Sequence, residues 1–179
     1  MSQVSDFVDR LDACCAGTAH WRTFEVLCTE ILEFLFVPPL NRPIPQPRTY
    51  SGTNRRDVVL PNRNFDQSNN WGLLLRELNA RMILFEFKNY DATDIGHEEV
   101  IQTDNYLTEP MGKLAIMVCS KAPDNGAHIQ RNTMYSRHGK VILFLNKEHL
   151  KEMLYIKERG EDPSDLIIDL VEHFYLQHE

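Results

Sequence analysis

Two charged residues stand close together at the end of an apolar segment. Glu86 and Lys88 close a run that begins at Met82, and side chains two apart on a strand point to the same face of a sheet. Met82 and Leu84 would bury that face. A carboxylate and an ammonium are costly to bury there unless they are paired or hold a metal. The pattern therefore predicts a functional site, with a salt-bridged strand end as the simpler alternative.

A third charged residue, Asp57, lies upstream near the start of another expected strand. Two converging carboxylates, Asp57 and Glu86, are hard oxygen ligands for Mg²⁺, and the backbone carbonyl of Phe87 is a candidate third ligand. Such a metal would polarise a scissile phosphate and lower the pKa of a bound water, while Lys88 would orient or help deprotonate that water. These residue types match phosphodiester hydrolysis and require no histidine or cysteine.

Basic residues surround Asp57 in the sequence. The segment 42–63 holds five arginines and one acid, although the formal net charge of the chain is −7. Arg55 and Arg56 would hold phosphates on either side of a cut. A solvated face, or pairing with the acidic C-terminal helices, explains the two arginines equally well. The acidic net charge argues against a general nucleic-acid binder.

The stretches GTNRRDVVLPN, WGLLLRELNARMILFEFKNY and EEVIQTDNYL resemble the PD-(D/E)xK nuclease superfamily, and within it the Mrr-like, restriction-endonuclease-like group. The resemblance covers roughly residues 20–158. It implies that Asp57 is the metal-binding aspartate, and that Glu86 and Lys88 fill the acidic and lysine positions of the last motif. It also implies the family fold, an α/β/α sandwich with a mixed central sheet.

Two further residues match the family's pattern outside the strands. Glu25, in TFEVLCTEIL, matches a first-helix glutamate that many members carry next to the metal. Gln102, one turn before Tyr106, matches a glutamine that contacts the active site in the family. The sequence departs from the family where Arg56, rather than a proline, precedes the aspartate. Each match has a plainer alternative, a helix-edge carboxylate in water for Glu25 and a surface side chain for Gln102.

What the resemblance implies is Mg²⁺-dependent cleavage of DNA, with Mn²⁺ able to substitute and RNA left open as a substrate. Members leave a 5′-phosphate, and many serve in restriction or anti-phage defence. One site cuts one strand, so a homodimer is expected, and a separate protein is expected to supply targeting or activation. The candidate nucleic-acid contacts are Arg48, Arg55, Arg56, Arg63 and Asn89. The alternative is a non-catalytic nucleic-acid-binding or partner-interaction module on the same fold.

The bulk properties favour one domain over residues 1–179 in a reducing cytoplasm. The chain is 42% hydrophobic and 25% charged, as in ordinary globular proteins. Its four cysteines form no CxxC pair, which argues against a disulfide framework and a zinc site. The apolar runs are too short to span a membrane, and no secretory signal opens the sequence.

Hydrophobic periodicity predicts the elements that must position these residues. Helices are expected over 2–16, 19–36, 68–79, 97–109, 123–138, 147–158 and 164–177. Strands are expected over 48–50, 56–60, 81–88, 113–120 and 141–145, the last two continuously apolar, as is typical of the middle of a sheet. This order predicts an α/β sandwich with helices on both faces of a mixed sheet.

Overall fold

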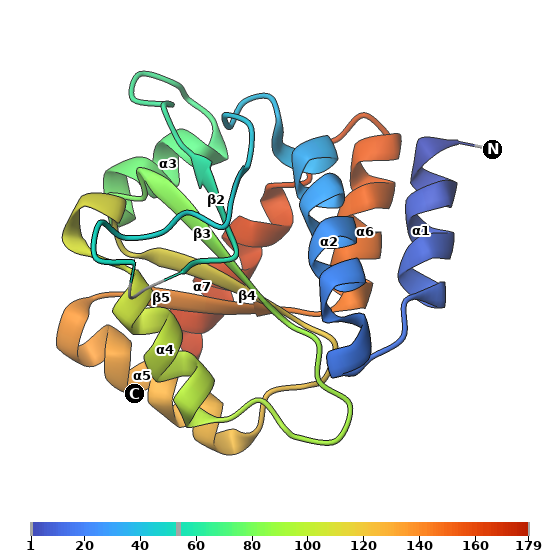
Figure 1. Cartoon of the computed structure of the whole chain (residues 1–179). Coiled ribbons are helices and arrows are strands. Elements are labelled where there is room, and N and C mark those ends of the chain that lie inside the picture. The colour runs from blue at the N-terminus through green and yellow to red at the C-terminus, as the bar shows by residue number, and fades with distance from the viewer. Residues whose placement is uncertain (1, 53–54, 179) are drawn as a thin grey trace.

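A computed structural model describes residues 2–52 and 55–178 of the chain (Figure 1). The helices are α1 (Gln3–Ala13), α2 (Trp21–Phe36), α3 (Asn70–Leu78), α4 (His97–Tyr106), α5 (Asn125–His138), α6 (Lys147–Glu158) and α7 (Asp165–Gln177). Short 3₁₀ turns cover Thr18–His20 and Glu109–Met111. The strands are β1 (Ile44–Pro45), β2 (Val58–Pro61), β3 (Met82–Lys88), β4 (Leu114–Cys119) and β5 (Val141–Leu145).

The five strands form one mixed sheet in the order β1-β2-β3-β4-β5. The pairs β1–β2 and β2–β3 are antiparallel, whereas β3–β4 and β4–β5 are parallel. Strand β4 is buried along its whole length, as its continuous apolar sequence predicts. Parallel strands need crossover helices, and α4 and α5 supply them. The antiparallel half and the parallel half therefore meet at β3.

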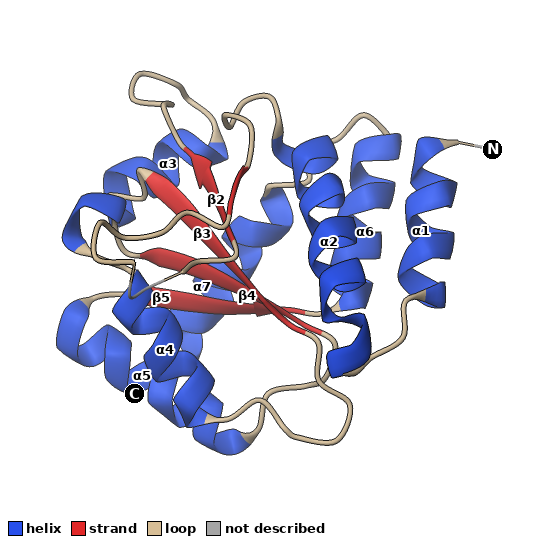
Figure 2. Cartoon of the chain, in the orientation of Figure 1, coloured by secondary structure: helices blue, strands red, loops and turns tan. Residues whose placement is uncertain are grey.

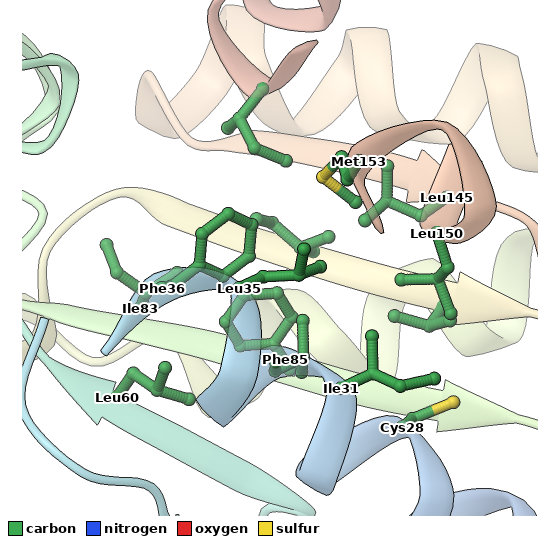
Figure 3. Close-up of a cluster of buried hydrophobic side chains, with 14 of the residues drawn as sticks. Cys28, Ile31, Leu35, Phe36, Leu60, Ile83, Phe85, Leu145, Leu150 and Met153 are labelled. Carbon is green, nitrogen blue, oxygen red and sulfur yellow. The ribbon is translucent and has the colours of Figure 1, made fainter. Parts of the chain in front are cut away.

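Helices cover both faces of the sheet (Figure 2). One face carries the larger core, in which side chains from β2 and β3 such as Leu60, Ile83 and Phe85 meet α2 residues such as Ile31 and Phe36 (Figure 3). The other face packs against α4 and α5 through a smaller cluster that includes Leu84 of β3. Because side chains alternate along a strand, Glu86 and Lys88 share the second face with Leu84.

The α/β class with helices on both faces of a mixed sheet is confirmed, but the first strands differ from the prediction. Residues 48–50 form no strand, and Arg48 meets Arg55 only in an isolated bridge. Beside β3, the partner of β2 is instead β1, inside a proline-rich segment over which no strand is predicted. Ile44 and Pro45 pair there with Val59 and Val58 at the sheet edge, where a proline's missing N–H is tolerated. The turn predicted between the two strands falls partly on residues 53–54, outside the described residues.

The start of α2 also differs from the prediction. The helix predicted over 19–36 begins at Trp21, after a 3₁₀ turn that covers Thr18–His20. Trp21, in the first turn of α2, is 45% exposed, whereas Trp71 of α3 is buried. No helix in the described part of the chain is long and apolar enough to cross a membrane.

Candidate active site

The pairing of β2 with β3 brings Asp57 and Glu86 together. Val58 lies opposite Phe85, so Asp57, just before β2, lies opposite Glu86. Two hydrogen bonds fix the pair. The Asp57 backbone N–H donates to Glu86 Oε1 over 3.3 Å, and the Phe87 backbone N–H donates to Asp57 Oδ2 over 2.8 Å. The long-range register of an antiparallel pair therefore places the two carboxylates at one end of the sheet.

Lys88 is held beside this pair by two partners. Its Nζ lies 3.9 Å from Glu86 Oε2 and donates a hydrogen bond of 2.9 Å to Gln102 Oε1 on α4. The Gln102 side-chain N–H group donates in turn to the Tyr106 hydroxyl over 2.9 Å. Helix α4 thus fixes the Lys88 ammonium through the Gln102 amide, whose oxygen bonds Lys88 and whose nitrogen bonds Tyr106. The predicted grouping of Asp57, Glu86, Lys88 and Gln102 is present in the structure.

Two carboxylates lie side by side at this group, with the charges of Lys88 and of two arginines near them. Glu86 is only 2% exposed, and its burial, together with the charge of Asp57, raises its pKa to about 8, while Lys88 lowers it in part. Burial also raises the pKa of Asp57, against the lowering effect of its bond from the Phe87 N–H. Glu86 is buried and Asp57 is half-buried, and a bound cation would stabilise the ionised forms of both carboxylates.

Glu25 lies near the pair but has a partner of its own. It is 7% exposed on α2 and accepts a hydrogen bond of 3.0 Å from the Gln46 side chain. On the opposite face of β3, Phe87 packs edge-on against Phe24, with the ring centroids 6.4 Å apart, so α2 passes the same end of the sheet. After burial and other effects, the charge of Glu25 also raises the pKa of Asp57. Gln46 has no sequence signal, because it lies in an irregular proline-rich segment.

The residues present fit a divalent cation of the Mg²⁺ type. Asp57 and Glu86 offer hard carboxylate oxygens close together, and the Phe87 carbonyl lies between Glu86 and Lys88 in the sequence. Among residues 2–52 and 55–178, no three His, Cys, Asp or Glu side chains are arranged to hold a metal. A cation here would thus use two carboxylates, backbone oxygen and water, as Mg²⁺ commonly does.

Two of the five expected nucleic-acid contacts are buried and have structural partners. Arg56 is 7% exposed, and its Nε and Nη2 donate to the Tyr106 carbonyl over 2.9 and 2.8 Å. Asn89 is 4% exposed, and its side-chain N–H group donates to the carbonyls of Cys15 and Gly17. Arg56 therefore ties the segment before β2 to α4, and Asn89 ties the end of β3 to the segment before α2.

The other three arginines are exposed, but they do not lie together. Arg55 is near the carboxylates, because its charge is among those that lower the pKa of Asp57. Arg48 lies beside Arg55 through the isolated bridge. Arg63 follows the other end of β2, about 20 Å from Asp57 for an extended chain. The basic segment read from the sequence is thus divided between the two ends of β2.

Comparison with known proteins gives one informative similarity. The chain is 26% identical over 168 residues to a protein of Escherichia coli (strain K12) named putative transposon gamma-delta 80.3 kDa protein. The match covers 92% of this chain but 23% of that protein, so the chain spans about a quarter of the relative's length. No family model matches the chain, and no solved structure matches it.

Proposed function

We propose that this chain is a Mg²⁺-dependent endonuclease that hydrolyses phosphodiester bonds of DNA. The observation that carries the proposal is the convergence of Asp57, Glu86 and Lys88 at neighbouring strand ends, with Gln102 bonded to the lysine. An ion pair kept for stability alone needs one carboxylate beside the lysine, whereas this group brings two carboxylates together and buries one of them, Glu86. Because the charge of Asp57 raises the pKa of Glu86, a cation that relieves their repulsion fits between them.

The residues divide the chemistry between them. Asp57 and Glu86 would hold Mg²⁺, with the Phe87 carbonyl as a further ligand, and the bound ion supplies a polarised phosphate and an acidified water. Lys88 Nζ orients the attacking water and offsets the charge that develops on the phosphate. Gln102 keeps Nζ turned toward the carboxylates. Exposed Arg55 is the arginine placed to bind a phosphate flanking the cut.

Glu25 has an auxiliary place in this scheme. Its carboxylate accepts a hydrogen bond from Gln46, and its charge would help hold a cation bound at Asp57 and Glu86. Mn²⁺ prefers the same oxygen ligands as Mg²⁺ and is expected to substitute for it.

The finer fold assignment belongs to the same proposal. The order α2–β1–β2–β3–α4–β4 supports a restriction-endonuclease-like sandwich, with α3 inserted between β2 and β3. The Mrr-like motifs lie on the expected elements, with the aspartate before β2, the Glu-x-Lys at the end of β3 and the glutamine on α4. The first strand is the main departure, because a strand was predicted over residues 48–50 and β1 covers Ile44–Pro45.

The biological setting is a proposal of the same kind. Similarity to a protein named for a transposon is compatible with a DNA-directed role, and restriction or anti-phage defence is the setting that the family resemblance favours. The relative is about four times longer, so other segments or a partner chain would supply targeting or activation. Double-strand cleavage would require a second copy of the chain. A cytoplasmic location remains the expectation.

The test is cleavage of supercoiled plasmid by the wild type, Lys88→Ala and Lys113→Ala, with Mg²⁺, with Mn²⁺ and with EDTA. Lys113 is an exposed lysine just before β4, at the opposite end of the sheet, and serves as the matched control. Metal-dependent nicking by the wild type and Lys113→Ala, lost in Lys88→Ala, is the expected result.

Calorimetry with Mg²⁺ decides the case in which the wild type does not cut. We expect binding that Asp57→Ala removes. If the wild type neither cuts plasmid nor binds Mg²⁺ through Asp57, the nuclease proposal fails, and the non-catalytic interaction module replaces it.

A further inference from the structure

A second site lies at the carboxyl ends of β4 and β5, apart from the carboxylate group. A cavity of about 620 Å³ opens there between α5, α7 and the beginning of α6. Asp57, Glu86, Lys88 and Gln102 do not line it. In open α/β sheets, ligands bind outside the carboxyl ends of parallel strands, and β4 and β5 are parallel. The position and size are those of a small-molecule site.

The base of this cavity holds a buried arginine without a counter-ion. Arg131 of α5 is 9% exposed, and its guanidinium lies between the rings of Phe144 and Phe174, 5.0 and 5.1 Å from their centroids. Its Nε has no hydrogen-bond partner, and it forms no ion pair with any described residue. The two aromatic faces offset part of the free-energy cost of burying the guanidinium charge. They accept none of the N–H hydrogens that lie in the guanidinium plane. The positive charge of Arg131, which lines the cavity, is therefore left for a ligand to balance.

The other polar groups of the cavity also favour an anion. His128, His149 and His173 line it from three different helices. Arg131 is close enough to His128 that its charge, after burial, is the next largest cause lowering the pKa of that histidine. Helix α6 begins at the cavity, and the positive end of its dipole attracts negative charge. Within the described ranges, these histidines are not arranged with other ligands to hold a metal.

The other charged side chains that line the cavity already have hydrogen-bond or ion-pair partners in the protein. Lys147 donates to the carbonyls of Leu11 and Cys14, and Lys121 pairs with Asp94. The one acid in the lining, Glu148, has a side chain that is 76% exposed and pairs with a lysine of its own helix. Arg131 therefore sets the charge that a ligand meets, and His128 and His149, whose pKa values burial lowers, add neutral hydrogen-bonding groups.

We propose that this cavity binds the phosphate group of a nucleotide-sized organic phosphate, with Arg131 as the main contact. A phosphate has three acceptor oxygens and can take hydrogen bonds from a guanidinium fork and from histidines at once, whereas a carboxylate has two. The cavity is larger than inorganic phosphate needs, and Leu145 and Leu170 add apolar wall for the organic part. The proposal is independent of the nuclease, since the two sites share no residue.

The experiment is isothermal titration calorimetry in EDTA with adenosine 5′-monophosphate, inorganic phosphate and adenosine. The wild type is expected to bind the monophosphate and not adenosine. Arg131→Gln is expected to weaken binding about tenfold or more, because it removes a charged hydrogen-bond donor. Arg137→Gln removes an exposed arginine from the last turn of the same helix and is expected to bind like the wild type.

Two exposed side chains keep the test decisive if Arg131→Gln does not fold. His128→Gln and His173→Gln alter the lining without touching the core, and each is expected to weaken binding by about threefold. A 5′-phosphorylated tetranucleotide that binds as tightly as the monophosphate would identify a strand end as the source of the phosphate. Preference for the monophosphate would identify a free nucleotide.

Three results overturn the proposal. The wild type binds neither the monophosphate nor inorganic phosphate, or Arg131→Gln and Arg137→Gln weaken binding equally, or Lys88→Ala abolishes it. The last result would place the ligand at the carboxylate group instead. Because the titration contains no metal, its result does not depend on whether the chain is a metal-dependent nuclease.

Discussion

Replacing Glu86 with glutamine tests the electrostatics of the carboxylate group without changing its shape. Burial and the charge of Asp57 raise the pKa of Glu86 from 4.5 to about 8. The folded protein therefore binds a proton more tightly than the unfolded chain does, and it keeps that advantage below pH 4.5. As pH rises from 4.5 to about 8, the stabilisation that comes from this tighter proton binding is lost. The free energy of unfolding of the metal-free protein therefore falls over that range.

The size of the fall follows from the pKa. Each tenfold change in proton affinity is worth about 1.4 kcal/mol. A pKa that moves from 4.5 to about 8 makes the loss about 3 kcal/mol between about pH 5 and about pH 8. Raising the pKa of Asp57 by burial acts in the same direction. Glu86→Gln does not titrate and is expected to remove most of this slope.

The assay is urea unfolding, followed by circular dichroism, across this pH range in EDTA at constant ionic strength. Glu98→Gln, at an exposed position in the first turn of α4, is the matched control and should retain the wild-type slope. Saturating Mg²⁺ should flatten the wild-type profile, because a cation stabilises the ionised carboxylates. Equal slopes for the wild type and Glu86→Gln would refute the reasoning, since the carboxylate would then titrate normally.

Three further predictions concern single residues. Gln102→Leu should reduce plasmid cleavage at least about tenfold, because the amide orients the Lys88 ammonium, while the free energy of unfolding should change by less than about 1 kcal/mol, because Gln102 is exposed. Unchanged cleavage would contradict this positioning role. Gly112→Ala should destabilise the protein by more than about 3 kcal/mol in urea unfolding, because φ is +99° and a Cβ would lie 1.9 Å from the Asn79 carbonyl oxygen; wild-type stability would contradict this packing. Cys15 is exposed and should react with a thiol reagent in the folded protein, whereas Cys119, whose pKa burial raises to about 12, should react only after unfolding; equal labelling rates would contradict the burial.

The sequence by itself determined the elements that carry local signals. The continuous apolar runs of β4 and β5 and the alternation that ends in Glu86 and Lys88 fix strands without knowledge of their partners, because burial on two faces or one face leaves different patterns. Helical periodicity likewise placed α2 through α7 within a few residues. The candidate group Asp57, Glu86 and Lys88 followed from charged residue types at the expected strands, and Gln102 followed from the family resemblance.

Only the tertiary structure decided which polar side chains are covered and what they bond. Arg56 and Asn89 are polar residues in polar stretches of the sequence, which is typical of exposed positions. In the structure both are buried and donate hydrogen bonds to backbone carbonyls of distant segments. Gln46 is the partner of Glu25 because it directly follows β1, which pairs with β2 at the sheet edge. Strand β1 has only two residues, too few to show a periodic pattern in the sequence. Arg131 reads as part of a polar helix, and only the packing of α5 near α7 places it between two rings. Patterns along a chain record which face is buried, whereas partners across the fold depend on register and packing, which no local pattern encodes.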